Sequence, residues 1–179
     1  MIGVILAAGV GSRLRPMTNN KPKCLVTVAG ISILDYQLNA YRKAGISDVY
    51  IIVGYEGDKI KTHCKYIKDL NITIIENDEY EITNNMYSLF LVKKYVYNKS
   101  FILNNADLAI SDDIIKRMVE SDKPDLVSVD VGLFNDESMK VTLKDNFISN
   151  IAKNISKDNS YGCSIDFYKF SPSSSSIFF

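Results

Sequence analysis

Short apolar runs alternate with segments of helical periodicity along the first two thirds of the chain. Runs rich in β-branched residues predict strands, and such runs occur at residues 2–6, 48–53, 71–75, 100–103 and 126–131. Between them, apolar residues recur every three to four positions, which predicts helices from Ser32 to Gly45 and at residues 59–70, 86–95 and 112–120. Strands that alternate with helices favour right-handed parallel crossovers and therefore an α/β sheet.

The pattern changes after residue 131. Shorter apolar runs with polar turns between them predict the strands of a small meander at residues 139–143, 147–151 and 163–170. Ser171 and Pro172 have the residue types of a helix N-cap and a first helical position, so a helix is expected to begin there. A frayed serine-rich tail is the alternative. Because the chain stops where that helix should continue, we expect residues 1–179 to form a single domain that lacks its C-terminal helical end.

Charge and cysteine usage exclude several function classes. The chain carries 21 basic and 21 acidic residues, whereas a general nucleic-acid or membrane-surface binder would show a basic excess.

The chain has three cysteines, Cys24, Cys64 and Cys163, and they are widely spaced. An odd number without a close pair is typical of reduced thiols in a cytoplasmic protein. The apolar start at residues 2–8 is too short for a membrane span and lacks the basic segment of a signal peptide. His63, beside Cys64, is the only histidine, so a helical surface is favoured there over a zinc site.

The stretch from Ile5 to Leu25 carries the main candidate chemistry. An apolar strand runs into Gly9 and Gly11, and four cations follow, at Arg13, Arg15, Lys21 and Lys23. Glycines let the backbone approach a ligand closely, and successive free N–H groups form a concavity that binds anions. The pattern therefore predicts a phosphate-rich ligand, with a nucleotide as the first choice. A P-loop and a dinucleotide fingerprint both fail, because GxxxxGK is absent, as are a third glycine and an acid after the second strand.

A longer pattern covers the same stretch. From Leu6 to Leu25 the chain matches L-A-A-G-x-G-S-R-L-x-P-x-T-x-x-x-P-K-x-L at every fixed position. This pattern resembles the signature of the nucleotidyltransferases that make NDP-sugars and related activated alcohols. Residues 84–89 (NNMYSL) are similar to the phosphocholine cytidylyltransferase branch of that family. The resemblance covers essentially the whole chain and implies a three-layer, Rossmann-like α/β fold with a mostly parallel sheet and a small β meander near the C-terminus.

The resemblance also implies a reaction. It is that of a Mg²⁺-dependent cytidylyltransferase, which transfers CMP from CTP to a small phosphorylated acceptor, releases pyrophosphate and forms a CDP conjugate for capsule or other surface polysaccharide modification. Phosphoglutamine is the leading acceptor on the resemblance, with phosphocholine or a sugar 1-phosphate as the alternative. The chain has no Trp for an aromatic cage around choline, although its 11 Tyr leave phosphocholine open. A nucleotide-binding module without turnover and a purely structural domain are the rivals, and exposed aromatics near the tail leave a homodimer open.

The nucleotide is expected to lie on the glycine loop. Backbone N–H groups between Ala8 and Ser12 would hold the triphosphate, and the Arg13 guanidinium would add a planar fork. By the resemblance, Lys23 neutralises charge at the α-phosphate. A solvated basic loop is the alternative. The complete expected set is Leu6, Ala7, Ala8, Gly9, Gly11, Ser12, Arg13, Lys23, Asn77, Asn84, Asn85 and Ala106. The asparagines in it offer amides to a pyrimidine, and a helix N-cap is the competing use for Asn84 or Asn85.

Asp107 follows a predicted strand at the edge where α/β sheets bind ligands. The resemblance identifies it with the aspartate that binds Mg²⁺, a cation that prefers oxygen ligands; a turn or N-cap aspartate is the alternative. With Arg13 and Lys23 it forms the expected catalytic set. Asp166 is available as a second metal ligand, but by the resemblance that acid lies beyond Phe179.

Two lysines on the predicted meander are the candidates for binding the acceptor. They are Lys140 and Lys153. By the resemblance, Lys153 grips the phosphate of the acceptor. For each lysine, a solvated strand position is the alternative.

Overall fold

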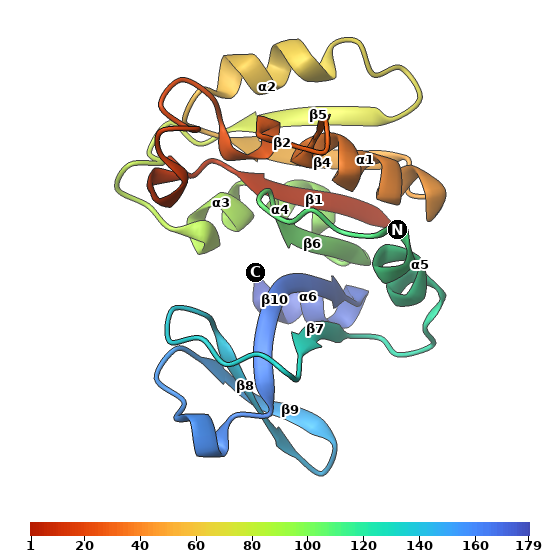
Figure 1. Cartoon of the computed structure of the whole chain (residues 1–179). Coiled ribbons are helices and arrows are strands. Elements are labelled where there is room, and N and C mark those ends of the chain that lie inside the picture. Colours follow the sequence, from red (N-terminus) through yellow and green to blue (C-terminus); the bar gives the residue numbers. More distant parts are fainter.

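The molecule is built around one large β-sheet, and the computed structural model describes residues 1–179 (Figure 1). Its first half consists of four parallel strands, β1 (Ile2–Ala7), β4 (Asp48–Val53), β5 (Asn71–Glu76) and β6 (Phe101–Asn105). Apolar residues fill β1, as expected for a central parallel strand that is covered on both faces. Because these strands run in one direction, the segments that follow them all emerge at the same edge of the sheet.

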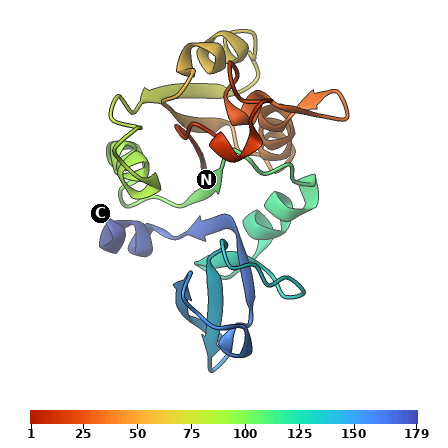
Figure 2. The same ribbon diagram turned by 60° about the vertical axis from the view of Figure 1, so that its left-hand side comes forward.

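Antiparallel strands extend the sheet beyond β6. They are β7 (Leu126–Asp130), β8 (Lys140–Lys144), β9 (Phe147–Ala152) and β10 (Gly162–Phe170). The strand order is β5-β4-β1-β6-β10-β8-β9, with β7 also paired to β10. Between Ser164 and Tyr168 the register of β10 against β7 shifts, and Asp166 there has a left-handed φ of 56°. Figure 1 and Figure 2 show β8 and β9 projecting below the parallel half. With β10 they are the three strands of the predicted meander, which is confirmed.

Helices cover both faces of the parallel half. One face carries α1 (Ile33–Lys43), α2 (Gly57–Cys64) and α5 (Asp112–Glu120); the other carries α3 (Asn85–Leu91), α4 (Lys93–Val96) and α6 (Pro172–Phe178). Two buried apolar clusters match these faces, one containing Ile5 with Leu34, the other Val4 with Leu89. Neighbouring residues of a strand point to opposite faces, so β1 contributes to both cores. The predicted three-layer α/β fold is confirmed.

The C-terminal residues form a helix and not a frayed tail. The Ser171 hydroxyl caps α6 by accepting a hydrogen bond from the Ser174 N–H at 3.2 Å. Ser175 is fully buried, and its hydroxyl accepts a hydrogen bond from the Lys99 N–H at 3.2 Å. Phe178 packs on Phe170, with 5.6 Å between the ring centroids. These contacts hold α6 against the sheet.

Two predicted helices differ from their apolar periodicity, one by ending early and the other by being divided. The helix expected over residues 59–70 ends at Cys64, because the chain must turn before Leu70 becomes buried at the entrance to β5. The helix expected over residues 86–95 is divided into α3 and α4 at Val92, whose N–H bonds the Leu89 carbonyl three residues back at 3.2 Å. Apolar periodicity continues through such a break because both pieces face the same core.

Short elements complete the chain: the 3₁₀ helices η1 (Ser12–Leu14), η2 (Lys23–Leu25) and η3 (Lys157–Asn159), and a hairpin of β2 (Thr27–Val28) and β3 (Ile31–Ser32). Within residues 1–179, no helix combines the length and the apolar character needed to cross a lipid bilayer.

Candidate active site

The glycine loop after β1 presents open backbone to the solvent. A Cβ added at Gly9 would meet no atom within 4 Å. At Gly11 the φ angle is +67°, and an added Cβ would lie 3.3 Å from the side chains of Lys23 and Thr18. Gly11 is therefore required by the conformation of the chain. Gly9 has no such requirement, and its exposed backbone leaves space that a ligand can fill.

Contacts on two sides hold this loop in place. The buried Thr18 hydroxyl donates to the Gly11 carbonyl at 2.8 Å. On the other side, the Tyr55 N–H donates to the Ala8 carbonyl at 3.1 Å. Gly54 permits this approach, since a Cβ there would lie 2.7 Å from the Ala8 oxygen. The residues at the end of β4 thus fix the backbone of the predicted phosphate cradle.

The predicted cations around the loop differ in their contacts. Arg13 lies in η1, is exposed, and takes part in no ion pair. Lys23, in η2, forms an ion pair and a hydrogen bond with Asp107, although 84 positions separate them in the sequence. The two side chains keep 27% and 33% of their surface exposed. Ion pairs this accessible contribute only about 0–1 kcal/mol to stability. A phosphate can therefore take the place of Asp107 beside Lys23, and a cation the place of Lys23 beside Asp107.

Cys24 is directly next to Lys23 but has no place in the chemistry. It is buried, and burial raises the pKa of its thiol to about 12. A thiolate, not a thiol, is the nucleophile in cysteine chemistry. Cys24 therefore serves packing under η2.

Asp107 lies in a turn that several hydrogen bonds support. The Ala106 N–H donates to the Leu6 carbonyl at 3.0 Å, which joins the turn to the end of β1. Gln37 of α1 donates its side-chain amide to the carbonyls of Asn105 at 3.0 Å and Leu108 at 2.9 Å. Sequence reasoning missed Gln37. The available signal was a glutamine on the apolar face of a predicted helix.

The three predicted base-binding asparagines have different environments. Asn84 caps α3, accepting hydrogen bonds from the N–H groups of Met86 at 3.0 Å and Tyr87 at 3.2 Å. Asn77 is 2% exposed and donates both amide hydrogens, to the Thr83 and Ser88 hydroxyls, each at 3.1 Å. A base contact through the Asn77 side chain would have to replace these bonds. The structure thus supports a local role for Asn77 and Asn84.

Asn85 is the asparagine that reaches the end of β6. Its amide donates to the Asn105 side chain at 3.2 Å, and Asn105 donates in turn to Asp166 at 3.0 Å. The other Asp166 oxygen accepts the Tyr168 hydroxyl at 3.0 Å. Burial raises the pKa of Tyr168 to about 12, so this hydroxyl keeps its proton at neutral pH. Each Asp166 oxygen accepts one hydrogen bond and keeps further acceptor capacity, so Asp166 stays available as a second metal ligand.

The donor set around Asp107 fits Mg²⁺ bound together with a nucleotide. Within residues 1–179 there is no group of three His, Cys, Asp or Glu side chains able to hold a metal. Mg²⁺ commonly uses only one or two carboxylates, with phosphate oxygens and waters completing its shell. One carboxylate beside an open phosphate cradle meets that requirement.

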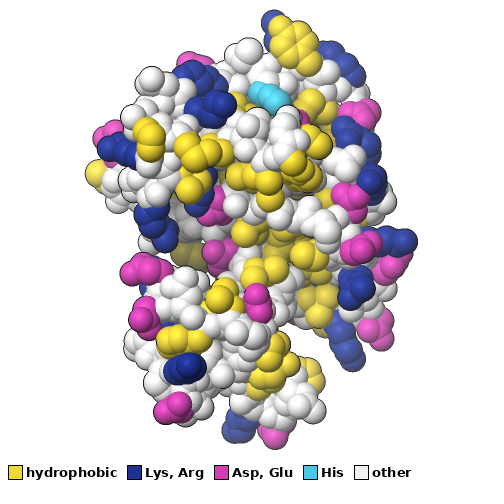
Figure 3. Space-filling model, in the orientation of Figure 1, with side chains coloured by type: hydrophobic (Ala, Val, Ile, Leu, Met, Phe, Trp, Pro, Cys, Tyr) yellow, Lys and Arg dark blue, Asp and Glu magenta, His cyan; other side chains and the backbone are white.

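The only histidine, His63 (cyan in Figure 3), pairs with Asp35 and not with Asp107: its ring nitrogen Nε2 is 2.7 Å from the Asp35 carboxylate.

The two predicted acceptor lysines lie in different surroundings. Lys140 is 1% exposed, donates to the Asp136 carbonyl at 3.0 Å and lies 5.5 Å from the centre of the Phe134 ring. Lys140 is therefore not a solvated strand residue. To bind an acceptor phosphate, its ammonium would have to release the Asp136 carbonyl. Lys153 is exposed directly after β9. Neither lysine hydrogen-bonds Lys23 or Asp107.

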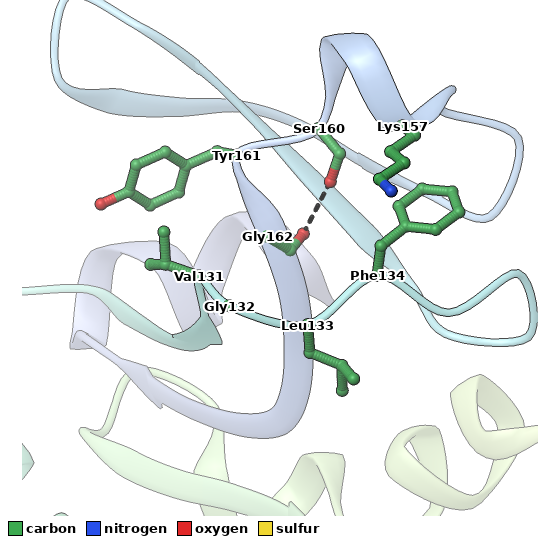
Figure 4. Close-up of a pocket in the computed structure, with 8 residues that line it drawn as sticks. All are labelled: Val131, Gly132, Leu133, Phe134, Lys157, Ser160, Tyr161 and Gly162. Atoms are coloured by element: carbon green, nitrogen blue, oxygen red, sulfur yellow. Dashed lines mark hydrogen bonds between the residues drawn. The ribbon is translucent and has the colours of Figure 1, made fainter.

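Two hollows lie outside the predicted set of charges. A pocket of about 160 Å³ lies between the loop after β7 and the start of β10 (Figure 4), lined by Val131, Gly132, Leu133, Phe134, Lys157, Ser160, Tyr161 and Gly162. None of the predicted site residues lines it. A hollow of about 310 Å³ at the ends of β4 and β5 includes Asn77 but also carries the carboxylates of Glu56, Asp58, Glu76 and Asp78. Lys61 also lines the hollow and pairs with Asp58 and Glu76, so four carboxylates face one ammonium. The excess negative charge repels phosphate, and the glycine loop remains the candidate cradle.

Comparison with known proteins decides the family. Residues 2–138 match the family described as nucleotidyl transferase, which is most of the chain and includes the glycine loop and Asp107. The chain belongs to the nucleotidyl transferase family. This confirms the family that the motif between Leu6 and Leu25 predicts.

Relatives within the nucleotidyl transferase family include cytidylyltransferases. The chain is 44% identical over 103 residues to the choline-phosphate cytidylyltransferase of Streptococcus pneumoniae, covering 57% of this chain and 43% of the relative. It is 32% identical over 136 residues to the CTP:phosphoglutamine cytidylyltransferase of Campylobacter jejuni, covering 73% of this chain and 53% of the relative. The chain thus spans about half the length of the curated relatives it matches.

A solved nucleotidyl transferase structure supports the fold. The inositol-1-phosphate CTP transferase from T. maritima superposes with a TM-score of 0.79 at 24% identity, covering 98% of this chain and 72% of that one. The α/β architecture and its C-terminal strands are therefore those of the family.

Proposed function

We propose that this nucleotidyl transferase is a cytidylyltransferase, which transfers CMP from CTP to a small phosphorylated acceptor and releases pyrophosphate. The observation that carries the proposal is the meeting of Lys23 and Asp107 at the glycine loop, where the Lys23 side chain lies against Gly11. The names of the two relatives, both cytidylyltransferases, support CTP as the donor.

The residues of the loop would divide the work along the triphosphate. Free N–H groups from Ala8 to Ser12 bind the phosphates, and Arg13 faces the oxygens of the departing pyrophosphate. The ammonium of Lys23 leaves Asp107 and neutralises charge on the α-phosphate. A phosphate oxygen of the acceptor attacks the α-phosphorus in line, and the bond from that phosphorus to the β-phosphate bridging oxygen breaks. No general base is needed because the attacking oxygen is already ionised, so alignment and charge placement carry the catalysis.

Asp107 would hold Mg²⁺ in the nucleotide complex. The bound cation supplies positive charge to the phosphate oxygens. The exposed carboxylate becomes available once Lys23 turns to the α-phosphate. For the base, Asn85 is the favoured contact: it is exposed and its amide makes one hydrogen bond, to Asn105. Asn77 uses both of its amide hydrogens, and the Asn84 oxygen caps α3.

Phosphoglutamine is the leading acceptor of the proposal. The Campylobacter relative named for it is similar over 73% of this chain, against 57% for the choline-phosphate relative. The absence of Trp also gives no support to a choline cage. Lys153 is the proposed ligand of the acceptor phosphate, with Lys140 secondary because it is buried. Cytoplasmic action and surface polysaccharide modification belong to the same proposal.

The direct test is a pyrophosphate-release assay. The protein is incubated with CTP, MgCl₂ and phosphoglutamine, phosphocholine or glucose 1-phosphate in turn, with UTP as the nucleotide control. Release with CTP and phosphoglutamine is expected to exceed the others. Release only with another acceptor overturns the acceptor assignment, and release only with UTP overturns the donor.

Asp107→Ala is expected to abolish turnover while the melting temperature stays close to that of the wild type, because the Lys23 ion pair is exposed and contributes little. Pyrophosphate release and thermal unfolding measure the two effects. Full Mg²⁺-dependent activity in the variant would remove Asp107 from the site.

A nucleotide-binding module without turnover is the second candidate. It is favoured by one observation: within residues 1–179 no group of three His, Cys, Asp or Glu side chains lies close enough together to hold a metal ion. Calorimetry with CTP separates the two. Binding of CTP without pyrophosphate release from any acceptor would support the binding module.

A further inference from the structure

Helix α1 sends a buried amide to the turn that carries Asp107. Gln37 is 0% exposed and lies on the face of α1 that Leu34 and Tyr41 share. Its Nε2 donates one hydrogen bond to the Asn105 carbonyl and another to the Leu108 carbonyl, at 3.0 and 2.9 Å. These two carbonyls flank Ala106 and Asp107, so one side chain links the two ends of the turn.

The acceptor end of the same amide has no partner. Gln37 Oε1 is buried and makes no hydrogen bond. A buried acceptor without a partner costs free energy that an apolar side chain would avoid. Packing alone therefore does not account for a glutamine here. Its contribution lies in the two donors, which hold the backbone on either side of Asp107.

Other polar groups of α1 act on neighbouring positions and leave this role to Gln37. The Tyr41 hydroxyl bonds the Asn104 side chain, one residue before the turn. Asn39 donates to Asp112 at 3.2 Å, at the start of α5. Among the side chains of α1, only Gln37 reaches carbonyls on both sides of Asp107.

We propose that Gln37 is a positioning residue, whose amide clamps the turn from Asn105 to Leu108 and so aims the Asp107 carboxylate at the nucleotide-bound cation. This inference rests on the proposed function, because it assigns Gln37 to the reaction through Asp107. Partners outside the metal shell commonly change metal affinity or activity by about 10- to 100-fold when removed. A change of that size is expected on loss of the clamp.

The test compares Gln37→Met with Asn39→Ala. Methionine retains the length and unbranched shape of glutamine without its donors, whereas Asn39→Ala removes an amide on the same helix that does not touch the turn. Backbone order parameters from NMR are expected to fall from about 0.85 to below about 0.6 at residues 106–108 in Gln37→Met only. The affinity for Mn²⁺ in the presence of CTP, measured by electron paramagnetic resonance, is expected to fall about 10- to 100-fold in the same variant. The Mg²⁺ concentration that gives half-maximal pyrophosphate release should rise by a similar factor.

Unchanged order parameters and Mn²⁺ affinity in Gln37→Met overturn the proposal, as does an equal change in Asn39→Ala. If the methionine variant does not fold, Gln37→Asn replaces it. Its side chain is one methylene shorter, so the amide no longer reaches the two carbonyls, and the same outcomes apply. If the wild type releases no pyrophosphate with any acceptor, the proposed function fails. The NMR and Mn²⁺ measurements then decide the role of Gln37 on their own.

Discussion

At the scale of single residues, two glycines of the same loop are needed for different reasons. Gly11 has a left-handed backbone, whereas Gly9 has open space where a side chain would be. Gly9→Ala is therefore expected to leave the melting temperature nearly unchanged and to raise the KM for CTP about tenfold or more, equivalent to about 1.4 kcal/mol. Differential scanning fluorimetry and pyrophosphate-release kinetics measure the two quantities.

Gly11→Ala provides the contrast. The left-handed conformation costs a non-glycine residue about 1–2 kcal/mol, so this variant should lose stability. An unchanged KM for CTP in Gly9→Ala would mean that the ligand does not occupy the space beside Gly9.

Lys23 and Lys43 can be compared directly, because each is a solvent-accessible lysine that forms an ion pair with an aspartate. Lys23→Met is expected to lower kcat about 100-fold or more, because it removes a cation that neutralises charge in the transition state. Lys43→Met should leave kcat unchanged, because Asp112 lies at the start of α5, outside the catalytic set. Steady-state kinetics decide the point. Equal effects in the two variants would assign Lys23 to the surface.

At the scale of elements, the attachment of α1 to β6 depends on a buried hydroxyl. Tyr41 is 0% exposed and its hydroxyl donates to the Asn104 side chain, whose amide in turn donates to the Asn105 carbonyl at 3.1 Å. Tyr41→Phe leaves the Asn104 oxygen buried without this donor. The free energy of unfolding is expected to fall by about 1–3 kcal/mol, measured by urea denaturation.

Tyr36→Phe on the same helix is the control. Its hydroxyl makes an exposed bond to the Val28 carbonyl at 3.2 Å, and surface changes of this kind stay within about 0.5 kcal/mol. Equal losses in both variants would show that the buried bond has no special role.

Local sequence patterns predict most elements but not how distant residues meet. The helix at residues 112–120 and the strand at 48–53 have the predicted bounds, because the spacing of their apolar residues depends only on a few neighbours. The pairing of Lys23 with Asp107 depends on the order of strands in the sheet. The burial of Lys140 depends on how the loop carrying Phe134 folds back. Such contacts leave no periodic signal.

The same reasoning explains what was predictable at the site. The glycine loop and Asp107 could be located because each follows an apolar strand. The cap formed by Asn84 was one of two open uses, and only the backbone geometry of α3 decides for it. The clamp by Gln37 required knowing that α1 packs beneath the turn after β6.

At the scale of the whole molecule, the parallel half and the meander differ in burial. Nine of the twelve residues of β1 and β4 are buried, whereas four of the six residues of β9 are exposed. Amide hydrogen exchange should therefore be slowest in β1, β4 and β6 and fastest, among the strands, in β9, because local opening exposes little apolar surface there. Exchange followed by mass spectrometry measures this order. Uniform protection across all strands would contradict it.

Strand β10 belongs to both parts of the molecule. Its C-terminal part pairs with β6 and its N-terminal part with β8, while β7 pairs with it on both sides of the bulge at Asp166. In evolutionary terms, this makes the meander a module joined to the rest of the sheet through one strand. The turn residues of the β8–β9 hairpin, Asp145 and Asn146, are both left-handed. If Lys153 after β9 binds the acceptor as proposed, insertions or exchanges in this hairpin would alter acceptor recognition while the register of β10 on β6 stays the same. Under the proposed function, a lineage could then acquire new acceptors without rebuilding the part that binds the nucleotide.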